Sequence, residues 1–256
     1  MTAALHSNVA NPTTPVPSRC GDWALYEYPV VTSTNLVAVN LPAWSAVRAD
    51  TQTNGRGRFQ RNWVSDRDGL WLSAVVPISQ DKIERRALPL AAGLAICDVL
   101  HELGISPRLR WPNDVLVKDR KLAGLLIDQF VLHLAVVGIG LNVRNRPEAL
   151  DPALAHQTAR LSDLMPRPPE LSVLTNLILR QLGQILTELK NDGPPAVLLR
   201  VNKLWGSPRS VELDLDGQLC RGLFTGVDPQ GRLALSDAAG QLSFYDAHEV
   251  RHLTET

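Results

Sequence analysis

Three arginines in a short glycine-containing segment carry the strongest chemical signal in this chain. Residues 51–63 read Thr-Gln-Thr-Asn-Gly-Arg-Gly-Arg-Phe-Gln-Arg-Asn-Trp, with fixed positive charges at Arg56, Arg58 and Arg61. Guanidinium groups are planar forks that match carboxylates and phosphates. The two glycines permit unusual backbone angles, so that backbone N–H groups can also approach a ligand. An enzyme that joins a carboxylic acid to a nucleotide needs this chemistry.

Four further segments carry polar or charged side chains, and each also has a purely structural explanation. They are Thr32-Ser33-Thr34-Asn35, Arg110-Trp111-Pro112-Asn113-Asp114, Arg120-Lys121-Leu122-Ala123-Gly124 and Gly138-Ile139-Gly140-Leu141-Asn142. Structurally, they can be a helix cap, a turn, a hairpin tip and a closely packed strand. In the functional interpretation, Thr32 to Asn35 face a ligand with hydrogen-bonding edges, and Asn113 and Asp114 offer an amide and a carboxylate to phosphates or a metal. Lys121 then points at an anion, and the glycines of Gly138 to Asn142 let a flat ligand approach.

The composition limits the function classes. The chain has 256 residues, enough for one large and one small domain, and its 26 basic and 26 acidic residues cancel. A zero net charge argues against a broad nucleic-acid or membrane-binding surface. The three cysteines are widely spaced and match no zinc motif, so we expect free thiols. Because no signal peptide or membrane-length apolar run is visible, we expect a cytoplasmic protein.

The apolar pattern predicts an α+β fold, in which a mixed β-sheet flanked by helices precedes a small β-barrel. Residues 1–20 are predicted to be a flexible tail, 21–204 the large domain and 205–256 the barrel. Strands are expected at 23–31, 44–49, 70–76, 108–111, 114–117, 121–128 and 131–139, and in the barrel at 211–215, 218–225, 233–235 and 242–245. Helices are expected to begin near 32–35 and to cover 86–103, 168–190 and 194–204.

Taken together and in order, the five segments resemble the biotin protein ligase family. That family carries Ser-Thr-Asn, a Gln followed by G-R-G-R, a W-P-N-D turn, K-L-A-G and G-I-G-x-N. The corresponding residues here are Ser33-Thr34-Asn35, Gln52 with Gly55 to Arg58, Trp111 to Asp114, Lys121 to Gly124, and Gly138 to Asn142. The resemblance is strong over about residues 23–145 and looser over 206–253. It implies a class II synthetase-like catalytic domain, shared by biotin and lipoate ligases, with an SH3-like C-terminal barrel.

Two positions depart from the family pattern. The family loop often has another glycine before its next arginine, where this chain has Phe59-Gln60. The residue before W-P-N-D is often lysine, where this chain has Arg110. The first departure could change how tightly the loop folds over a ligand. The second keeps the charge but removes a proton-transferring amine, so Arg110 is expected at most to position other groups.

The resemblance implies an ATP-dependent ligase. Such an enzyme forms biotinyl-5'-AMP and transfers biotin to a lysine of a biotin carboxyl carrier protein, a subunit of acetyl-CoA carboxylase. ATP and biotin are its substrates, and Mg²⁺ accompanies ATP without a certain protein ligand. The implied catalytic residues are Lys121, Arg56 and Arg58. The implied biotin-binding residues are Ser33, Thr34, Asn35, Gln52, Arg56, Gly57, Arg58 and Lys121. The implied ATP-binding residues are Arg58, Trp63, Asn113, Asp114, Lys121 and Asn142. Trp63 either stacks on adenine or belongs to the core, and both alternatives stay open.

Three alternatives were weighed against this interpretation. A lipoate–protein ligase has a related fold, but G-R-G-R and W-P-N-D favour biotin. A ligase that also represses transcription carries an N-terminal winged helix-turn-helix; only about twenty residues precede the first expected strand, so direct DNA binding is not expected. A non-catalytic, biotin-responsive binding protein would not need all the cationic positions. A monomer and a homodimer are equally compatible with the sequence. Residues 53–63 are expected to order over the ligand, because a reactive adenylate must be shielded from water.

Overall fold

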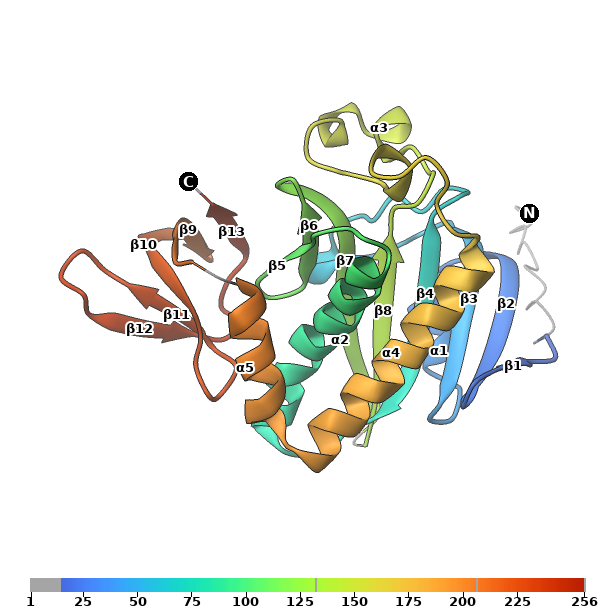
Figure 1. Cartoon of the computed structure of the whole chain (residues 1–256), viewed down its shortest axis with the longest axis horizontal. Helices are drawn as coiled ribbons and strands as arrows, with labels where there is room; N and C mark the ends of the chain where they lie inside the picture. Colours follow the sequence, from blue (N-terminus) through green and yellow to red (C-terminus); the bar gives the residue numbers. More distant parts are fainter. Residues whose placement is uncertain (1–14, 132, 206, 256) are drawn as a thin grey trace, which may run out of the picture.

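A computed structural model describes residues 15–131, 133–205 and 207–255. These residues form a large mixed β-sheet with helices packed on one face, and a second, antiparallel sheet lies beside one end of the large sheet (Figure 1). The predicted α+β class is therefore confirmed. The part of the predicted tail that covers residues 1–14 lies outside the described residues.

The large sheet contains eight strands of the described residues, in the order β1-β2-β3-β4-β8-β7-β6-β5. Strands β2 and β3 run parallel, and the other neighbours run antiparallel. The strands are β1 (Ser18–Cys20), β2 (Trp23–Val31), β3 (Ser45–Gln52), β4 (Leu70–Pro77), β5 (Arg108–Arg110), β6 (Asp114–Val117), β7 (Arg120–Val131) and β8 (Leu134–Leu141).

Two strand predictions need correction. Ser18–Cys20 was assigned to the flexible tail, but it is β1, which pairs with β2 around a tight turn and buries the Cys20 side chain. Val131 was expected to begin the strand that ends near Ile139. It instead ends β7, because the hairpin to β8 turns between Val131 and Leu134.

The two faces of the central strands differ because side chains alternate along a strand. On β4, Leu70, Leu72 and Ala74 belong to the main core, which α2 and α4 cover. Ser73 and Val75 therefore point to the opposite face, where the short helix α1 packs against β3, β4 and β8. Figure 1 shows α2 and α4 lying across one face of the large sheet. The opposite face thus carries a smaller apolar cluster, which includes Val75 and Val136, and the polar side chain of Ser73.

Four of the five α-helices of the described residues are those expected, with different ends at several places. The five are α1 (Thr34–Ala38), α2 (Lys82–Glu102), α3 (Pro147–Leu150), α4 (Leu171–Asn191) and α5 (Pro194–Trp205). The start of α2 was predicted at residue 86. It begins four residues earlier because Asp81 caps it, accepting hydrogen bonds from the backbone N–H groups of Ile83 at 2.6 Å and Glu84 at 3.2 Å. The short α3 was not predicted.

The C-terminal sheet has the strand order β12-β11-β10-β9-β13. Its strands are β9 (Arg209–Leu215), β10 (Gln218–Val227), β11 (Leu233–Ser236), β12 (Leu242–Tyr245) and β13 (His252–Glu255), and β13 was missed by sequence analysis. The sheet is attached to the large domain through Trp205 at the end of α5, whose ring lies 4.3 Å from that of Phe224. Arg108 of β5 also pairs with Glu255 of β13 at 2.5 Å. In the described residues, no helix has the length and apolarity needed to cross a membrane.

We expect Trp205→Ala to lower the free energy of unfolding by about 3–5 kcal/mol, because it leaves a large cavity next to Phe224. The Trp205 side chain is 3% exposed. Urea unfolding followed by circular dichroism measures the loss. Leu199→Ala on the same helix, where the side chain is 57% exposed, serves as the control and should cost less than about 1 kcal/mol. Equal losses of unfolding free energy in the two variants would contradict a stabilising role for the buried contact between Trp205 and Phe224.

Candidate active site

Glycines on the face opposite α2 and α4 make room for the site. A β-carbon on Gly138 would lie 2.4 Å from Oδ1 of Asn35, and one on Gly140 would lie 2.6 Å from the Trp63 indole. A β-carbon on Gly124, which pairs with Gly140 across β7 and β8, would lie 2.8 Å from the same indole. The glycines therefore admit two of the chain's own side chains. Trp63 lies half-buried on this face, which leaves both of its alternatives open.

A buried polar network joins the start of α1 to the end of β3. Ser33, Thr34 and Asn35 are each 4% exposed. The backbone N–H and the hydroxyl of Thr34 both donate to Oε1 of Gln52, at 2.8 and 3.0 Å. Nε2 of Gln52 in turn donates to the hydroxyl of Ser65 at 2.8 Å. Ser33 occupies the N-cap position of α1 without a side-chain capping bond, so capping does not explain why a serine stands there.

Two cations share one carboxylate at the other end of the face. Nζ of Lys121 lies 2.6 Å from Oδ1 of Asp114, and Nη2 of Arg110 lies 2.7 Å from Oδ2. Burial tends to raise the pKa of Asp114, but Lys121 and Arg110 outweigh it and hold that pKa below its usual value. Asp114 is therefore an ionised counterion with both oxygens engaged. The positioning role expected of Arg110 agrees with this geometry.

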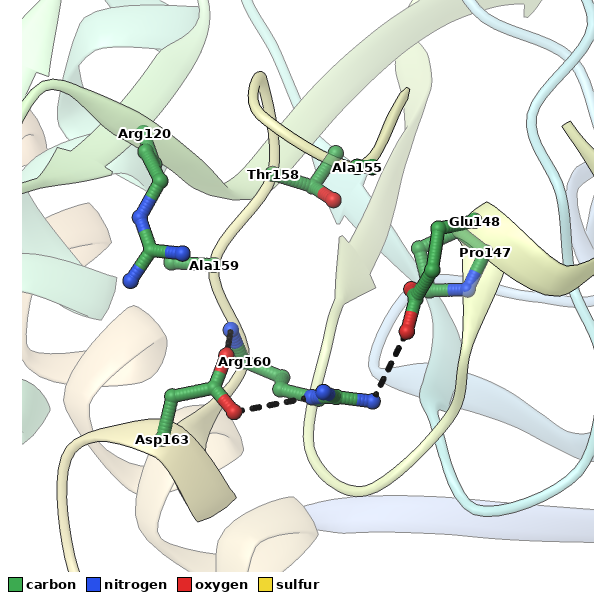
Figure 2. A pocket seen from close by; sticks show the side chains of 8 residues that line it. All are labelled: Arg120, Pro147, Glu148, Ala155, Thr158, Ala159, Arg160 and Asp163. Carbon is green, nitrogen blue, oxygen red and sulfur yellow. Dashed lines mark hydrogen bonds and ion pairs between the residues drawn. The ribbon is translucent and has the colours of Figure 1, made fainter. Parts of the chain in front are cut away.

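The loop after β8 fixes the backbone of Lys121. The N–H of Lys121 donates to the carbonyl of Gln157 at 2.8 Å, and the N–H of Ala159 donates to the carbonyl of Lys121 at 2.9 Å. A hollow of about 240 Å³ lies between this loop and Arg120. Figure 2 shows the side chains that line it, among which Arg160 bridges Glu148 at 3.2 Å and Asp163 at 3.0 Å. These ion pairs tie the two ends of the loop together and so help to hold Lys121 in register.

Two of the predicted nucleotide-binding residues use their amides inside the protein. Nδ2 of Asn142 donates to the carbonyl of Ala159 at 3.2 Å, and its Oδ1 accepts from Asn145 at 3.0 Å. Nδ2 of Asn113 donates to the carbonyl of Leu125. Both amides therefore brace the strands around Lys121, whatever further contact they make with a ligand.

The arginine loop contacts the segment that connects β12 to β13. Nη2 of Arg58 donates to the carbonyls of Ala247 and Val250, and Nη2 of Arg61 donates to the carbonyl of Arg251 at 3.0 Å. Phe59, one of the departures from the family pattern, lies with its ring centroid 4.5 Å from the Arg251 guanidinium. These contacts connect the loop to residues that sequence analysis did not associate with it.

The backbone and the charges of this loop are both unusual. Phe59 and Gln60 have φ angles of 55° and 59°, a left-handed conformation that is rare for residues other than glycine. Burial lowers the pKa of Arg58 to about 10, although the neighbouring Asp114 carboxylate acts in the opposite direction. Arg58 remains charged at neutral pH. Within the described part of the chain, the Arg56 side chain has no hydrogen-bond or ion-pair partner, and Gly57 donates its N–H to the carbonyl of Arg61 at 2.8 Å.

A cavity of about 320 Å³ lies at the seam between the loop, the W-P-N-D turn and the C-terminal sheet. Arg58 and Asn113 line it together with Phe59, Pro112 and Ala247. The structure therefore brings Arg58 close to Asn113 and Asp114. It also brings Lys121 close to Trp63, with Nζ of Lys121 at 4.9 Å from the centroid of the indole ring. The buried network of Thr34 and Gln52 forms a separate group on the same sheet face.

Sequence analysis missed four polar residues of this region. Ser73 and Asp128 hold the Asn35 amide, Ser65 holds Gln52, and Arg160 holds the loop behind Lys121. Ser73 left a signal, since it is the one polar residue in the apolar run from Leu70 to Val76. The other three lie outside any motif.

Comparisons with known proteins identify the family. Residues 29–142 match the profile of the biotin/lipoate A/B protein ligase family. A biotin–[acetyl-CoA-carboxylase] ligase of Mycobacterium tuberculosis is 36% identical over 213 residues, which cover 80% of this chain and 77% of that protein. This chain belongs to the biotin protein ligase family. A biotin–[acetyl-CoA-carboxylase] ligase of Paracoccus denitrificans is 30% identical and covered over 92% of its length, with 82% of this chain aligned.

The fold of this biotin protein ligase agrees with that assignment. The structure of the Aquifex aeolicus biotin protein ligase in complex with biotin and ATP matches it with a TM-score of 0.80 at 25% identity. The match covers 91% of this chain and 99% of that one, so it includes the C-terminal sheet.

We expect the stability difference between the wild type and Asp114→Asn to shrink in acid. Because the folded-state pKa of Asp114 lies below its ordinary value of 3.8, the carboxylate's contribution is present above that value and is lost as the pH falls through the lower pKa. Urea unfolding at a series of pH values from about 7 to about 3 measures the difference. Asp119→Asn, whose side chain is 86% exposed, is the control and should stay within about 0.5 kcal/mol of the wild type. A difference that grew in acid would contradict this assignment.

Proposed function

We propose that this chain activates biotin with ATP and transfers it to a lysine of a biotin carboxyl carrier protein of acetyl-CoA carboxylase. The observation that carries the proposal is the Lys121 amine, held at 2.6 Å from Asp114 on the same sheet face as the buried network of Thr34 and Gln52. The M. tuberculosis and P. denitrificans relatives are named for this activity, and the A. aeolicus relative was solved with biotin and ATP.

The first step brings two anions together. The biotin carboxylate attacks the α-phosphorus of ATP, the bond to the bridging oxygen breaks, and pyrophosphate leaves. At ~4 Å, two unit negative charges repel by about 1 kcal/mol in water and about 4 kcal/mol at an effective dielectric constant of about 20. Lys121 places one compact charge between them. Arg56, with no partner in the described residues, and Arg58 supply the charge that the phosphates need.

Substrate selection rests on the polar network. Biotin combines an apolar chain with a polar ureido ring. The end of the site that binds the ureido ring is formed by Ser33, Thr34, Asn35 and Gln52. These groups already bond one another and their neighbours in the protein, but hydroxyl and carbonyl oxygens can accept further hydrogen bonds. A lipoyl ring would remove water from that remaining capacity without replacing its hydrogen bonds, at a cost of roughly 1–3 kcal/mol per group. The network therefore supports biotin over lipoate. Backbone N–H groups from Arg56 to Arg58 complete the biotin site.

The second step passes biotin to the carrier. The neutral lysine amine attacks the acyl carbon of biotinyl-5'-AMP, the bond to the phosphate oxygen breaks, and AMP leaves while the nitrogen loses a proton. Water would compete for the same carbon, so the arginine loop must cover the intermediate. Its contacts with the C-terminal sheet give that sheet a part in closing the site.

Mg²⁺ enters this proposal as part of the ATP substrate. In the described residues, no group of three or more histidine, cysteine, aspartate or glutamate side chains is arranged to hold a metal. Both oxygens of Asp114 are taken by Lys121 and Arg110, so the residues present do not form a resident Mg²⁺ site. Phosphate oxygens and water, which Mg²⁺ prefers, can supply its coordination.

The setting of the enzyme is also part of the proposal. We place it in the cytoplasm, as a monomer or homodimer that does not bind DNA directly. The three cysteines, Cys20, Cys97 and Cys220, are free thiols in the structure, which fits a reducing compartment. The even balance of charges gives no support for a nucleic-acid surface.

The direct test is to mix the protein with biotin, ATP, Mg²⁺ and a biotin-acceptor domain and to weigh the acceptor by mass spectrometry. An acceptor that gains the mass of one biotinyl group supports the ligase. ATP–pyrophosphate exchange with biotin and lipoate in competition separates the two ligase classes. Exchange that lipoate supports better than biotin would select the lipoate alternative, and binding of biotin without exchange would select a regulatory protein.

We expect Lys121→Met to slow adenylate formation by at least about a hundredfold, because the charge that joins the two anions is lost. Pre-steady-state release of pyrophosphate measures the step. Lys190→Met, at an exposed position near the end of α4, is the matched control and should leave the rate unchanged. Full-speed adenylation by Lys121→Met with an unchanged melting temperature would overturn the role of this amine.

We expect Arg56→Gly to release biotinyl-5'-AMP, because the loop loses a charge that binds the intermediate. Escaped adenylate acylates lysines of unrelated proteins, so serum albumin added to the assay should gain biotin. The exposed Arg67→Gly, just beyond the loop, is the control and should label only the carrier. Labelling confined to the carrier in the Arg56 variant would refute the prediction.

A further inference from the structure

Asp128 lies on the site face of β7 without a cationic partner among the described residues. Gly124, Leu126 and Asp128 alternate on the same side of the strand. Gly124 pairs with Gly140 and Asp128 pairs with Val136 of β8. Val136 belongs to a small apolar cluster with Val75, so the carboxylate stands at the edge of that cluster.

The Asp128 carboxylate holds the amide of Asn35 in one orientation. Nδ2 of Asn35 donates to Oδ2 of Asp128 at 2.7 Å, and Oδ1 of Asn35 accepts from the hydroxyl of Ser73 at 2.6 Å. An ionised carboxylate only accepts hydrogen bonds. Turning the amide over would set its oxygen against the carboxylate with no proton between them. The amide packs directly against Gly138, where a β-carbon would lie 2.4 Å from its Oδ1.

The orientation extends from Asn35 to Gln52. The Ser73 hydroxyl lies 2.7 Å from Oγ1 of Thr34 as well as 2.6 Å from Asn35, and it has one proton to share. Oγ1 and the backbone N–H of Thr34 meet Oε1 of Gln52. The chain of bonds thus has a group that only accepts at one end, Asp128, and a backbone N–H that only donates near the other. Each hydroxyl between them takes its direction from these two ends.

The geometry points to Asp128 as a positioning residue for biotin recognition, an inference that rests on the proposed function. By fixing the Asn35 amide, the carboxylate decides which atoms of the network face the site as donors and which as acceptors. A ureido ring has one carbonyl that accepts and two N–H groups that donate, so it needs a site of defined polarity. Without the carboxylate, both orientations of the Asn35 amide become accessible, and the Ser73 hydroxyl can donate to Thr34 instead of Asn35.

The test compares Asp128→Asn with the wild type. The variant keeps the size of the side chain but removes the charge, and its own amide can face Asn35 in either sense. We expect the KM for biotin to rise by about tenfold or more. The KM for ATP and the kcat of adenylation should change by less than about threefold, since the reacting groups are untouched. Asp119→Asn, on the same hairpin but exposed, should leave all three unchanged.

An exchange of the two side chains separates positioning from simple packing. Asn35→Asp alone sets two carboxylates against each other and should abolish biotin binding. Asn35→Asp combined with Asp128→Asn restores a donor facing an acceptor and still lets position 35 accept from Ser73. We expect this double variant to recover biotin affinity to within about threefold of the wild type. It also decides the matter if Asp128→Asn alone does not fold.

Two results would overturn the inference. One is a KM for biotin in Asp128→Asn within twofold of the wild type, and the other is a double variant that binds biotin no better than Asn35→Asp. Calorimetry of the wild type keeps this separate from the proposed function. A wild type that does not bind biotin contradicts the proposed function, whereas equal binding by the wild type and Asp128→Asn contradicts the positioning role alone.

Discussion

One carboxylate between two cations organises the reactive end of this enzyme. The positive charges of Arg110 and Lys121 repel each other. The Asp114 carboxylate lies between them, with Oδ2 at 2.7 Å from Nη2 of Arg110 and Oδ1 at 2.6 Å from Nζ of Lys121. The hairpin from β6 to β7 brings Asp114 and Lys121 together: Asp114 pairs with Gly124, and the register of the two strands shifts between Val115 and Leu116. The triad keeps one net positive charge, so a chain of zero overall charge still attracts an anion at this point.

The packing of the large sheet places the Arg110–Asp114–Lys121 group on a face that the two long helices leave uncovered. Helices α2 and α4 cover one face of the large sheet, and glycines on β7 and β8 let Asn35 and Trp63 approach the other face closely. A larger side chain at Gly138 would displace Asn35, and one at Gly124 or Gly140 would displace the Trp63 indole, which lies beside Lys121. The loop that Arg160 ties together then braces Lys121 from behind. The glycines of β7 and β8 and the loop held by Arg160 therefore determine both the packing of this face and the position of Lys121.

Local signals made much of this predictable, and long-range contacts did not. Periodicity located α4 and the strands β2, β4 and β6, and the family motifs led to Thr34, Gln52 and Lys121. The partnership of Asn35 with Asp128 spans 93 positions, and the contact of Arg58 with Ala247 spans 189. Backbone carbonyls accept in the latter case, so no side-chain pattern records it. The short strands β1 and β13 exist because neighbouring strands pair with them, which composition does not reveal.

The hydrogen bonds between the arginine loop and the segment that connects β12 to β13 have a consequence for motion of the loop. Any lifting of the loop has to break the bonds from Arg58 and Arg61 to the carbonyls of Ala247, Val250 and Arg251. The ease with which this loop lifts is therefore expected to depend in part on a stretch of chain far from it in the sequence. Substitutions that move this stretch are expected to change how long the loop stays over the site, although they alter none of the residues of the loop itself.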